Sequence, residues 1–582
     1  MKPQLGILKD YKGDLLLGKL DTKDLLLLNV IYQRPLKENE YHDYCYVVLK
    51  NVRTGEKKLV TLEDPDMLIY VVKPEYRDYT HYPMYKALDM CNTYRVKYKS
   101  VEKFIGKVGG ENTQAYLDNC IRNNYAAAKN LHKWPYVLGS DYQYENYFRV
   151  EWALHYHNQD IEIKPTKMYL DIEVDTRSII GFPRPGECPI NAVSLIDEHT
   201  STVFVYLLDD PNNPQITDFI NDMDGFIQRC HEAFDEFYGV LDYQIQFFED
   251  EMDLIKSVWG KINELKRDFL EVWNLSFDIP YFIARIEALG EDPKSIMCHP
   301  DFKTPILSYR PDTSTYEWKK KNDVFIISSY TVFLDQMSDY IKIRKGKSEL
   351  KNVKLNAVAW KELRDEKLDY SDEADIKTLC EKNFALFTMY NIKDTLLQMG
   401  IERKTNDINT VYFTALDNAT AFQSVFSQTI VLKNYAYLSY YEQGYIIGNN
   451  KNVNYGEPRN YDRKKKKPDF EGALVADPML NSHIGMTLFG KPSMFVFLLV
   501  VDFDFSSMYP SILISHNINP ETMIGKVCLD GFGHFNPNPT DELYDQGKMF
   551  IEDLLSKDYG HIGKRYFNLP DTEELLKELE SI

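Results

Sequence analysis

The sequence predicts an α/β protein made of several domains. A chain of 582 residues is too long for one hydrophobic core, since a domain usually holds about 100–200 residues. Hydrophobic residues make up 44% of the chain, which is enough to build packed cores. Between residues 161 and 400, short apolar segments alternate with longer amphipathic ones, and this alternation is typical of strands and helices in α/β folds.

Composition and periodicity divide the chain into four parts. Residues 1–160 contain strand-like stretches such as YCYVVLKNV and a stretch at 82–94, YPMYKALDMCNTY, that we expect to be helical, so they predict an α+β domain. Residues 161–400 form the α/β domain. Residues 401–468 are interpreted as helices followed by a polar linker, and a further unit covers 469–582.

The net charge, the lack of long apolar runs and the cysteine spacing limit the functions that the protein can have. The net charge of −20 is unusual for a nucleic-acid protein, but enzymes that cut or extend nucleic acid need clustered carboxylates for metal ions. No run of eighteen apolar residues and no secretory leader is found, so we expect an intracellular protein that makes no membrane contact. The eight cysteines form no CxxC pair, which argues against a zinc knuckle or a disulfide framework.

The stretch YLDIEVDT contains the strongest local signal for chemistry. Residues two apart in a strand point to the same side, so Asp171 and Glu173 should project together from one face. Two carboxylates that close repel each other unless a cation lies between them, and oxygen ligands of this kind suit Mg²⁺ or Mn²⁺. A lone DxE is more often an exposed acidic strand face, so the motif needs further acids nearby.

Two later segments supply those acids. In EVWNLSFDIPYF, an expected strand or turn carries Asp278, with Asn274 and Phe277 just before it. In LFTMYNIKDTLL, an expected helix places Tyr390 and Asp394 one turn apart on the same face. An aspartate among apolar helix residues is costly to bury without a partner, and a metal site would provide that partner.

In this order, DxE, NxxFD and YxxxD resemble the three motifs of the DEDDy 3′→5′ proofreading exonucleases, whose fold is RNase H-like. The segment from 333 to 363, FLDQMSDYIKIRKGKSELKNVKLNAVAWKEL, is similar to the stretch before the third motif in family B DNA polymerases. The resemblance implies two Mg²⁺ or Mn²⁺ ions per active site. Their ligands would be Asp171, Glu173, Asp278 and Asp394. Tyr390 would orient the attacking water, and Asn274 and Phe277 would hold the frayed 3′ end of the DNA.

Near the end of the chain, DFSSMYPS at 504–511 resembles motif A of family B polymerases, with Asp504 rather than Asp502 in register. By this resemblance Asp504 binds the catalytic metals and the carbonyl of Phe505 completes a metal shell. The deoxynucleoside triphosphate would contact Ser507, Met508 and Tyr509, and Tyr509 would also exclude a 2′-hydroxyl. Upstream, FEGA resembles the element between the exonuclease and polymerase domains that contacts template DNA; the residues in question are Phe470, Gly472 and Ala473.

The resemblance also implies what the 582 residues lack. Motif B, about KxxxNSxYG, and motif C, about DTDS, do not occur, so the chain should hold the first part of a polymerase palm that ends near the fingers. Either a second polymerase chain carries these motifs, or the sequence is part of a longer chain. Primer-template DNA, single-stranded 3′ ends and triphosphates are the expected partners, with a sliding clamp as a further candidate. A phage-encoded protein would act in the cytoplasm of the bacterial host.

Three functions follow from these motifs. The first is the amino-terminal part of a replicative family B DNA polymerase with a complete proofreading exonuclease. The second is a free-standing 3′→5′ DNA exonuclease whose palm segment only binds DNA, which the intact DFSSMYPS disfavours. The third is a non-catalytic scaffold subunit of a replication complex, which has no need of clustered acids. The sequence therefore favours the first function.

Overall fold

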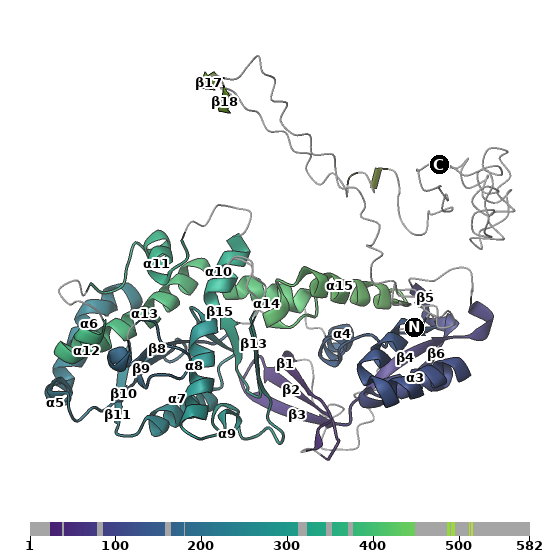
Figure 1. Ribbon diagram of the computed structural model, residues 1–582, viewed down its shortest axis with the longest axis horizontal. Helices are drawn as coiled ribbons and strands as arrows, with labels where there is room; N and C mark the ends of the chain where they lie inside the picture. The colour runs from purple at the N-terminus through teal and green to yellow at the C-terminus, as the bar shows by residue number, and fades with distance from the viewer. Residues whose placement is uncertain are drawn as a thin grey trace. The chain divides into compact units, whose positions relative to one another are not determined.

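The computed structural model describes residues 24–37, 40–77, 85–134, 136–156, 164–179, 181–311, 323–344, 352–369 and 376–447, with short pieces at 486–488, 491–494, 511 and 514–515 (Figure 1). Internal contacts divide the chain into two units, residues 1–76 with 83–453, and residues 77–82 with 454–582. In the second unit, the described strands are β17 (Met486–Leu488) and β18 (Lys491–Met494), an antiparallel pair. All elements below belong to the first unit.

Two small antiparallel sheets build the amino-terminal part. Strands β1 (Leu25–Gln33), β2 (Tyr44–Asn51) and β3 (Lys57–Glu63) form one sheet in the order β1-β2-β3. Strands β6 (Cys91–Lys97), β4 (Asp66–Val72) and β7 (Val137–Leu138) form the other, in the order β6-β4-β7.

Strand β2 is buried on both faces because its apolar residues alternate between two cores. Cys45, Val47 and Leu49 join the amino-terminal core. Tyr46 and Val48 join a second core that also includes residues from the middle of the chain. This arrangement explains a nearly continuous apolar run in an antiparallel sheet, where one solvated face is more usual.

The α-helices in the described residues of the amino-terminal part are α2 (Val101–Val108), α3 (Glu111–Asn123) and α4 (Tyr144–Tyr156). The helix expected at 82–94 is wrong, because the described residues there form β5 (Tyr85–Ala87), a short 3₁₀ turn and the start of β6. The stretch from Cys91 to Lys97 is rich in residues that favour strands, and it pairs along its whole length with β4, which outweighs the helix-like spacing upstream.

A six-stranded mixed sheet forms the middle of the chain, in the order β11-β10-β9-β8-β12-β15. Its strands are β8 (Lys167–Val174), β9 (Ile190–Asp197), β10 (Thr202–Leu208), β11 (Asp242–Phe248), β12 (Phe269–Val272) and β15 (Val332–Asp335). Strand β9 runs antiparallel to its neighbours β8 and β10, whereas β11, β12 and β15 each run parallel to a neighbour. The expected α/β organisation of this part is confirmed.

Helices cover both faces of this sheet (Figure 1). One face packs on α7 (Glu251–Leu265), α8 (Leu275–Ala288) and α9 (Pro293–Met297) through a core that includes Met168, Leu170 and Ile172. The other face packs on α5 (Pro214–Asn221), α6 (Met223–Tyr238), α12 (Ile376–Lys382) and α13 (Phe384–Thr405). Alternate residues of β8 therefore point toward α13.

The remaining described elements flank this layer. They are the hairpin β13 (Leu307–Arg310) and β14 (Val324–Ile327), the helices α10 (Gln336–Arg344), α11 (Leu355–Leu363), α14 (Asp407–Asp417) and α15 (Gln428–Glu442), and strand β16 (Tyr445–Ile447), which pairs with β5. The helical character expected after residue 401 is confirmed for α14 and α15. None of the helices in the described ranges is long and apolar enough to cross a membrane.

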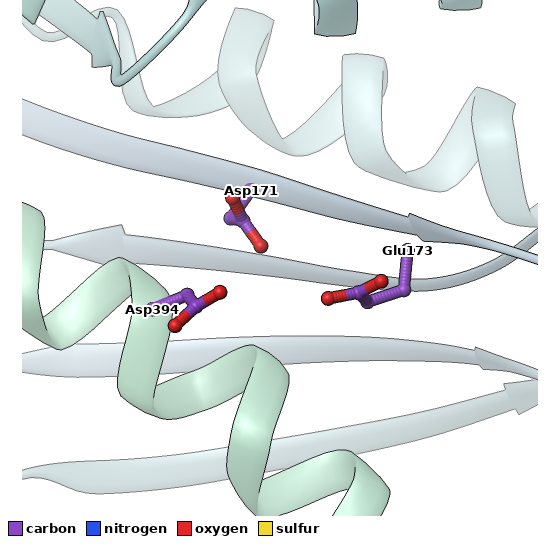
Figure 2. Close-up of side chains that lie close together, drawn as sticks. All are labelled: Asp171, Glu173 and Asp394. Carbon is purple, nitrogen blue, oxygen red and sulfur yellow. The ribbon is translucent and has the colours of Figure 1, made fainter. Parts of the chain in front are cut away.

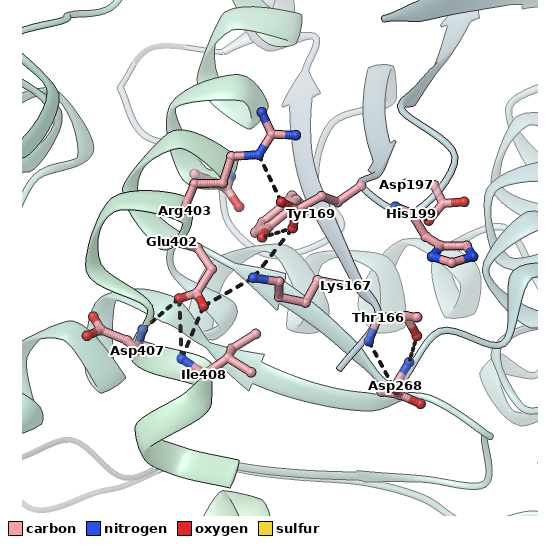
Figure 3. Close-up of polar contacts among 12 residues, drawn as sticks. Thr166, Lys167, Tyr169, Asp197, His199, Asp268, Glu402, Arg403, Asp407 and Ile408 are labelled. Atoms are coloured by element: carbon pink, nitrogen blue, oxygen red, sulfur yellow. Dashed lines mark hydrogen bonds and ion pairs between the residues drawn. The ribbon is translucent and has the colours of Figure 1, made fainter. Parts of the chain in front are cut away.

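A buried ion cluster joins the amino-terminal sheet to the six-stranded sheet. Asp268, just before β12, binds the ammonium group of Lys50, and that of Lys57 lies 3.0 Å from its Oδ1. Its Oδ2 accepts the backbone N–H of Thr166 at 2.8 Å, a contact drawn in Figure 3. Burial alone would raise the pKa of Asp268, but the two ammonium groups lower it below its usual value. The carboxylate is therefore charged and fully compensated.

Candidate metal centre

Three carboxylates from two distant segments meet between β8 and α13. Asp171 and Glu173 project from β8 on the face toward α13, and Asp394 projects from α13 toward them (Figure 2). One carboxylate oxygen of each lies within 4.8 Å of one oxygen of each of the others. The period of two in the strand and the helical position of Asp394 produce this convergence, as the sequence pattern predicts.

Asp278 approaches the same place from the opposite layer. It lies in the first turn of α8, with 5% of its surface exposed, rather than on the expected strand or turn. Two residues separate the helix from β12, and Asp278 stands near the backbone amide of Ile172 in β8. Burial and the charge of Asp171 raise the pKa of Asp278 well above its usual value, and the Ile172 amide opposes this rise only in part. Asp278 lies outside the three-carboxylate group but interacts electrostatically with Asp171 and Glu173.

Burial and mutual repulsion disfavour the charged forms of these acids. Burial raises the pKa of Asp171 well above its usual value, and the charges of Asp394 and Glu173 raise it further. Burial and Asp394 also raise the pKa of Glu173 to about 8. Carboxylates in such surroundings are stabilised either by taking up protons or by binding a cation.

The donor set fits a hard divalent cation. All the converging groups are carboxylates, which are the ligands that Mg²⁺ and Mn²⁺ prefer. Oδ1 of Asp394 is buried and has no hydrogen-bond partner in the described part of the chain, so it is an acceptor available to a cation. Asp171, Glu173 and Asp394 could therefore hold a metal ion, and Asp278 lies outside this group.

Lys367 is a site residue that the sequence analysis missed. Its ammonium group lies 2.5 Å from Oδ2 of Asp394 and donates to the Tyr390 hydroxyl at 3.0 Å. Burial lowers the pKa of Lys367, but Asp394 and Tyr390 outweigh this effect and raise it, so the lysine stays charged. Its local sequence, LRDEKLDY, is a mixed charge run of the kind usually found on a solvated surface, and no spacing connects it to the acids.

Tyr390 is 8% exposed and lies one helical turn before Asp394. Burial and the charge of Asp394 raise the pKa of its phenol, so it keeps its proton at neutral pH. The hydroxyl is therefore a neutral polar group that interacts with Asp394 and Glu173.

An aromatic pair lies beside α8. The ring of Phe277 packs 5.2 Å from that of Phe182 and 5.4 Å from that of Tyr281. Phe182 is 80% exposed, which is unusual for a large apolar side chain. Asn274 precedes α8, and its Oδ1 accepts the Ser276 hydroxyl at 2.7 Å. The sequence analysis identified Asn274 and Phe277 but missed Phe182, whose loop carries no periodic signal.

The expected polymerase residues lie outside the described residues. These are Phe470, Gly472, Ala473, Asp504, Phe505, Ser507, Met508 and Tyr509.

Comparisons with known proteins agree with the resemblance at the level of the family. A family model described as DNA polymerase family B matches residues 423–551, a range that contains the DFSSMYPS motif. The chain is 24% identical over 422 residues to the DNA-directed DNA polymerase of Escherichia phage RB69, covering 70% of this chain and 42% of the relative. It is 23% identical over 426 residues to the DNA-directed DNA polymerase of Enterobacteria phage T4, covering 69% and 41%.

A eukaryotic relative matches over a shorter range. The DNA polymerase delta catalytic subunit of Plasmodium falciparum (isolate K1 / Thailand) is 26% identical over 291 residues, covering 48% of this chain and 23% of the relative. The chain thus spans less than half the length of each of these three relatives.

Proposed function

From the distant homology of this chain to family B DNA polymerases, we propose that it provides the 3′→5′ proofreading exonuclease and the first part of the polymerase site of such an enzyme. The observation that supports the exonuclease most strongly is the convergence of Asp171, Glu173 and Asp394. Asp278 and Tyr390 lie beside these acids, so all three sequence motifs reach one place. We propose an RNase H-like fold for the domain that carries them.

The four acids would hold two Mg²⁺ or Mn²⁺ ions. When bound, such ions activate a water molecule and stabilise the leaving 3′ oxygen of a phosphodiester. The residues of the chain have separate tasks. Lys367 donates a hydrogen bond to the oxygen of Tyr390, which sets the phenol proton as a donor toward the attacking water. Burial strengthens the electrostatic effect of Asp394, which is 3% exposed, whereas Asp171 stays partly accessible to solvent.

The aromatic pair would hold the end of the DNA strand. Bases stack on aromatic rings without regard to sequence, which suits an enzyme that removes any mismatched nucleotide. Phe277 would contribute one ring and Phe182 the exposed one, while Asn274 would bind the sugar-phosphate backbone. The net charge of −20 is compatible with this substrate because metal ions reverse the local field at the carboxylates.

The polymerase part of the proposal concerns the motif A segment. Asp504 and the carbonyl of Phe505 would bind metal, Ser507, Met508 and Tyr509 would contact the triphosphate, and the FEGA element would contact template DNA. Motifs B and C are absent from the 582 residues, so synthesis would also need a segment or second chain that carries them. The protein would act inside the cell, in the bacterial host if phage-encoded, on primer-template DNA and with a sliding clamp as a candidate partner.

The exonuclease can be tested on the purified chain with 5′-labelled single-stranded DNA. We expect degradation from the 3′ end that requires Mg²⁺ or Mn²⁺, and a loss of at least about 100-fold in Asp171→Ala and Asp278→Ala. Glu151→Gln is the matched control, since Glu151 is a buried carboxylate in the amino-terminal helix α4. Absence of metal-dependent cleavage by a folded chain would contradict the proposal.

Polymerisation needs a second experiment. Together with a chain that carries motifs B and C, this chain should extend a primer, and Asp504→Ala should eliminate extension. Tyr509→Ala in the same complex should admit ribonucleotides. Cleavage without extension in any such mixture would favour a free-standing exonuclease, and extension by these 582 residues alone would show that the polymerase site has been misjudged.

A further inference from the structure

The proposed metal ligands come from β8 and α13, so contacts other than those of the ligands must fix the distance between this strand and this helix. Asp171 and Glu173 belong to β8, whereas Asp394 belongs to α13, more than two hundred residues later. One carboxylate oxygen of each acid lies within 4.8 Å of one oxygen of each of the others, and like charges that close repel one another in the absence of metal. Some other contact must therefore hold β8 and α13 at the distance that a cation needs.

Two buried amides on α13 make that contact. The side-chain N–H group of Asn391 donates to Oδ2 of Asp171 at 3.0 Å, and that of Gln398 donates to the backbone carbonyl of Leu170 at 3.2 Å. Both side chains are 0% exposed. They stand three residues before and four residues after Asp394, so all three share one face of the helix.

The side-chain amides of Asn391 and Gln398 both act as hydrogen-bond donors toward β8. The side-chain oxygens of Asn391 and Gln398 are buried and have no hydrogen-bond partner in the ranges that the structure describes. An unpaired buried carbonyl oxygen costs free energy, so an apolar residue of similar size would be the simpler choice if packing were the only need. What an apolar residue cannot supply is the N–H group directed at β8.

A third contact fixes the other end of the helix. Glu402 lies 3.4 Å from the ammonium group of Lys167 at the start of β8, and it accepts backbone N–H groups of Asp407 and Ile408 at the start of α14 (Figure 3). Thus α13 runs antiparallel to β8 and is attached to it at both ends. Asn391 is the contact in this series that touches a metal ligand directly.

We infer that Asn391 and Gln398 are positioning residues that set the spacing between the carboxylates of β8 and Asp394, and that Asn391 also orients the carboxylate of Asp171. By occupying Oδ2, the Asn391 amide directs the other oxygen of Asp171 toward the cation. This inference rests on the proposed metal-dependent exonuclease. Partners that orient metal ligands typically change metal affinity by about 10–100-fold when removed.

The test measures Mn²⁺ binding to the full-length, metal-free chain by calorimetry and electron paramagnetic resonance. Asn391→Leu and Gln398→Met remove the donors and keep similar volumes. Thr388→Val is the control, because Thr388 is equally buried on α13 but, among the described residues, its hydroxyl bonds to the carbonyl of Phe384 in its own helix. Thermal unfolding in chelator compares the stability of all three variants.

We expect Asn391→Leu to weaken Mn²⁺ binding by at least about tenfold and Gln398→Met by a smaller factor, with unfolding temperatures close to that of Thr388→Val. The metal concentration for half-maximal cleavage should rise in parallel, while the KM for DNA stays the same. Wild-type affinity in both variants would overturn the inference. If the wild-type chain binds no Mn²⁺, or Asp171→Ala binds it normally, the proposed function itself fails.

Discussion

The ammonium group of Lys367 lies 2.5 Å from Oδ2 of Asp394, the buried member of a group of three carboxylates. It gives these acids a positive counter-charge that does not depend on metal. The ammonium group of Lys367 and a bound metal ion would thus interact with the same carboxylate, that of Asp394. The stability of the metal-free protein and the activity of the metal-bound one should both depend on this lysine.

Replacing Lys367 with Met should lower the stability of the metal-free protein by about 1–3 kcal/mol, since Asp394 would lose its charged partner. Mg²⁺ should restore most of the loss, because a bound cation supplies the missing charge. Unfolding in denaturant, with chelator and with Mg²⁺, measures both effects. Lys361→Met is the control: Lys361 pairs with Glu362 at 3.5 Å on an exposed part of α11, where an ion pair contributes little.

Replacing Tyr390 with Phe should slow cleavage by about tenfold, the cost of one lost hydrogen bond in the reaction. The phenol is not among the proposed metal ligands, so Mn²⁺ affinity should change far less than the rate. Asp394→Asn should reduce both rate and affinity. Single-turnover cleavage and direct metal titration separate these cases, and equal losses in the two variants would assign the Tyr390 hydroxyl a structural role.

Replacing Phe182 with Ala should raise the KM for single-stranded DNA by about 5- to 100-fold, since stacking of one base contributes about 1–3 kcal/mol. Metal affinity and the rate at saturating DNA should change little. Phe237→Ala is a suitable comparison, because Phe237 is 67% exposed near the end of α6 and has no place in the proposed site. Equal KM values for Phe182→Ala and Phe237→Ala would exclude Phe182 from DNA binding.

Glu151, which lies in the amino-terminal helix α4, should make the stability of the protein depend on pH. Burial raises its pKa from 4.5 to about 7, although a contact with Tyr147 opposes the rise. A carboxyl with a raised folded-state pKa stabilises the fold below pH 4.5, and this contribution is lost as pH rises through 7. Glu151→Gln should therefore be more stable than wild type at pH 8, by at most about 3 kcal/mol, and similar near pH 4.

Calorimetric unfolding at pH 8 and near pH 4 measures the stability difference between Glu151→Gln and wild type. Glu102→Gln serves as a comparison of opposite sign: burial raises the pKa of Glu102, but its contact with His132 outweighs burial and lowers it. That variant should gain no stability at pH 8. A Glu151→Gln protein that is less stable than wild type at pH 8 would contradict the assignment.

The sequence predicted those site residues whose geometry follows from a single element. Asp171 and Glu173 share a face because a strand has a period of two, and Tyr390 and Asp394 share one because a helix turn has about four residues. The multidomain α/β character could also be read from the alternation of apolar and amphipathic segments. The RNase H-like fold and the four domain boundaries stay predictions.

Other residues reach the site through tertiary packing, which no local pattern reports. Lys367 lies in a charged loop segment and Phe182 in the connection between β8 and β9. Folding brings Lys367 to Asp394 and Phe182 to the ring of Phe277. Asp278 was assigned to a strand or turn because the apolar run before it continues from β12. The structure begins a helix there instead, with Asp278 in its first turn.

The pairing of Asp268 with Lys50 and Lys57 limits where the polypeptide can be shortened. Recombinant fragments designed to begin near residue 164 would keep the aspartate and remove both lysines, leaving a buried charge with no compensation. They would also expose the apolar surface that β2 covers with Tyr46 and Val48. Isolated fragments that carry the six-stranded sheet should therefore be started ahead of β1, or carry Asp268→Asn together with polar replacements on the uncovered surface.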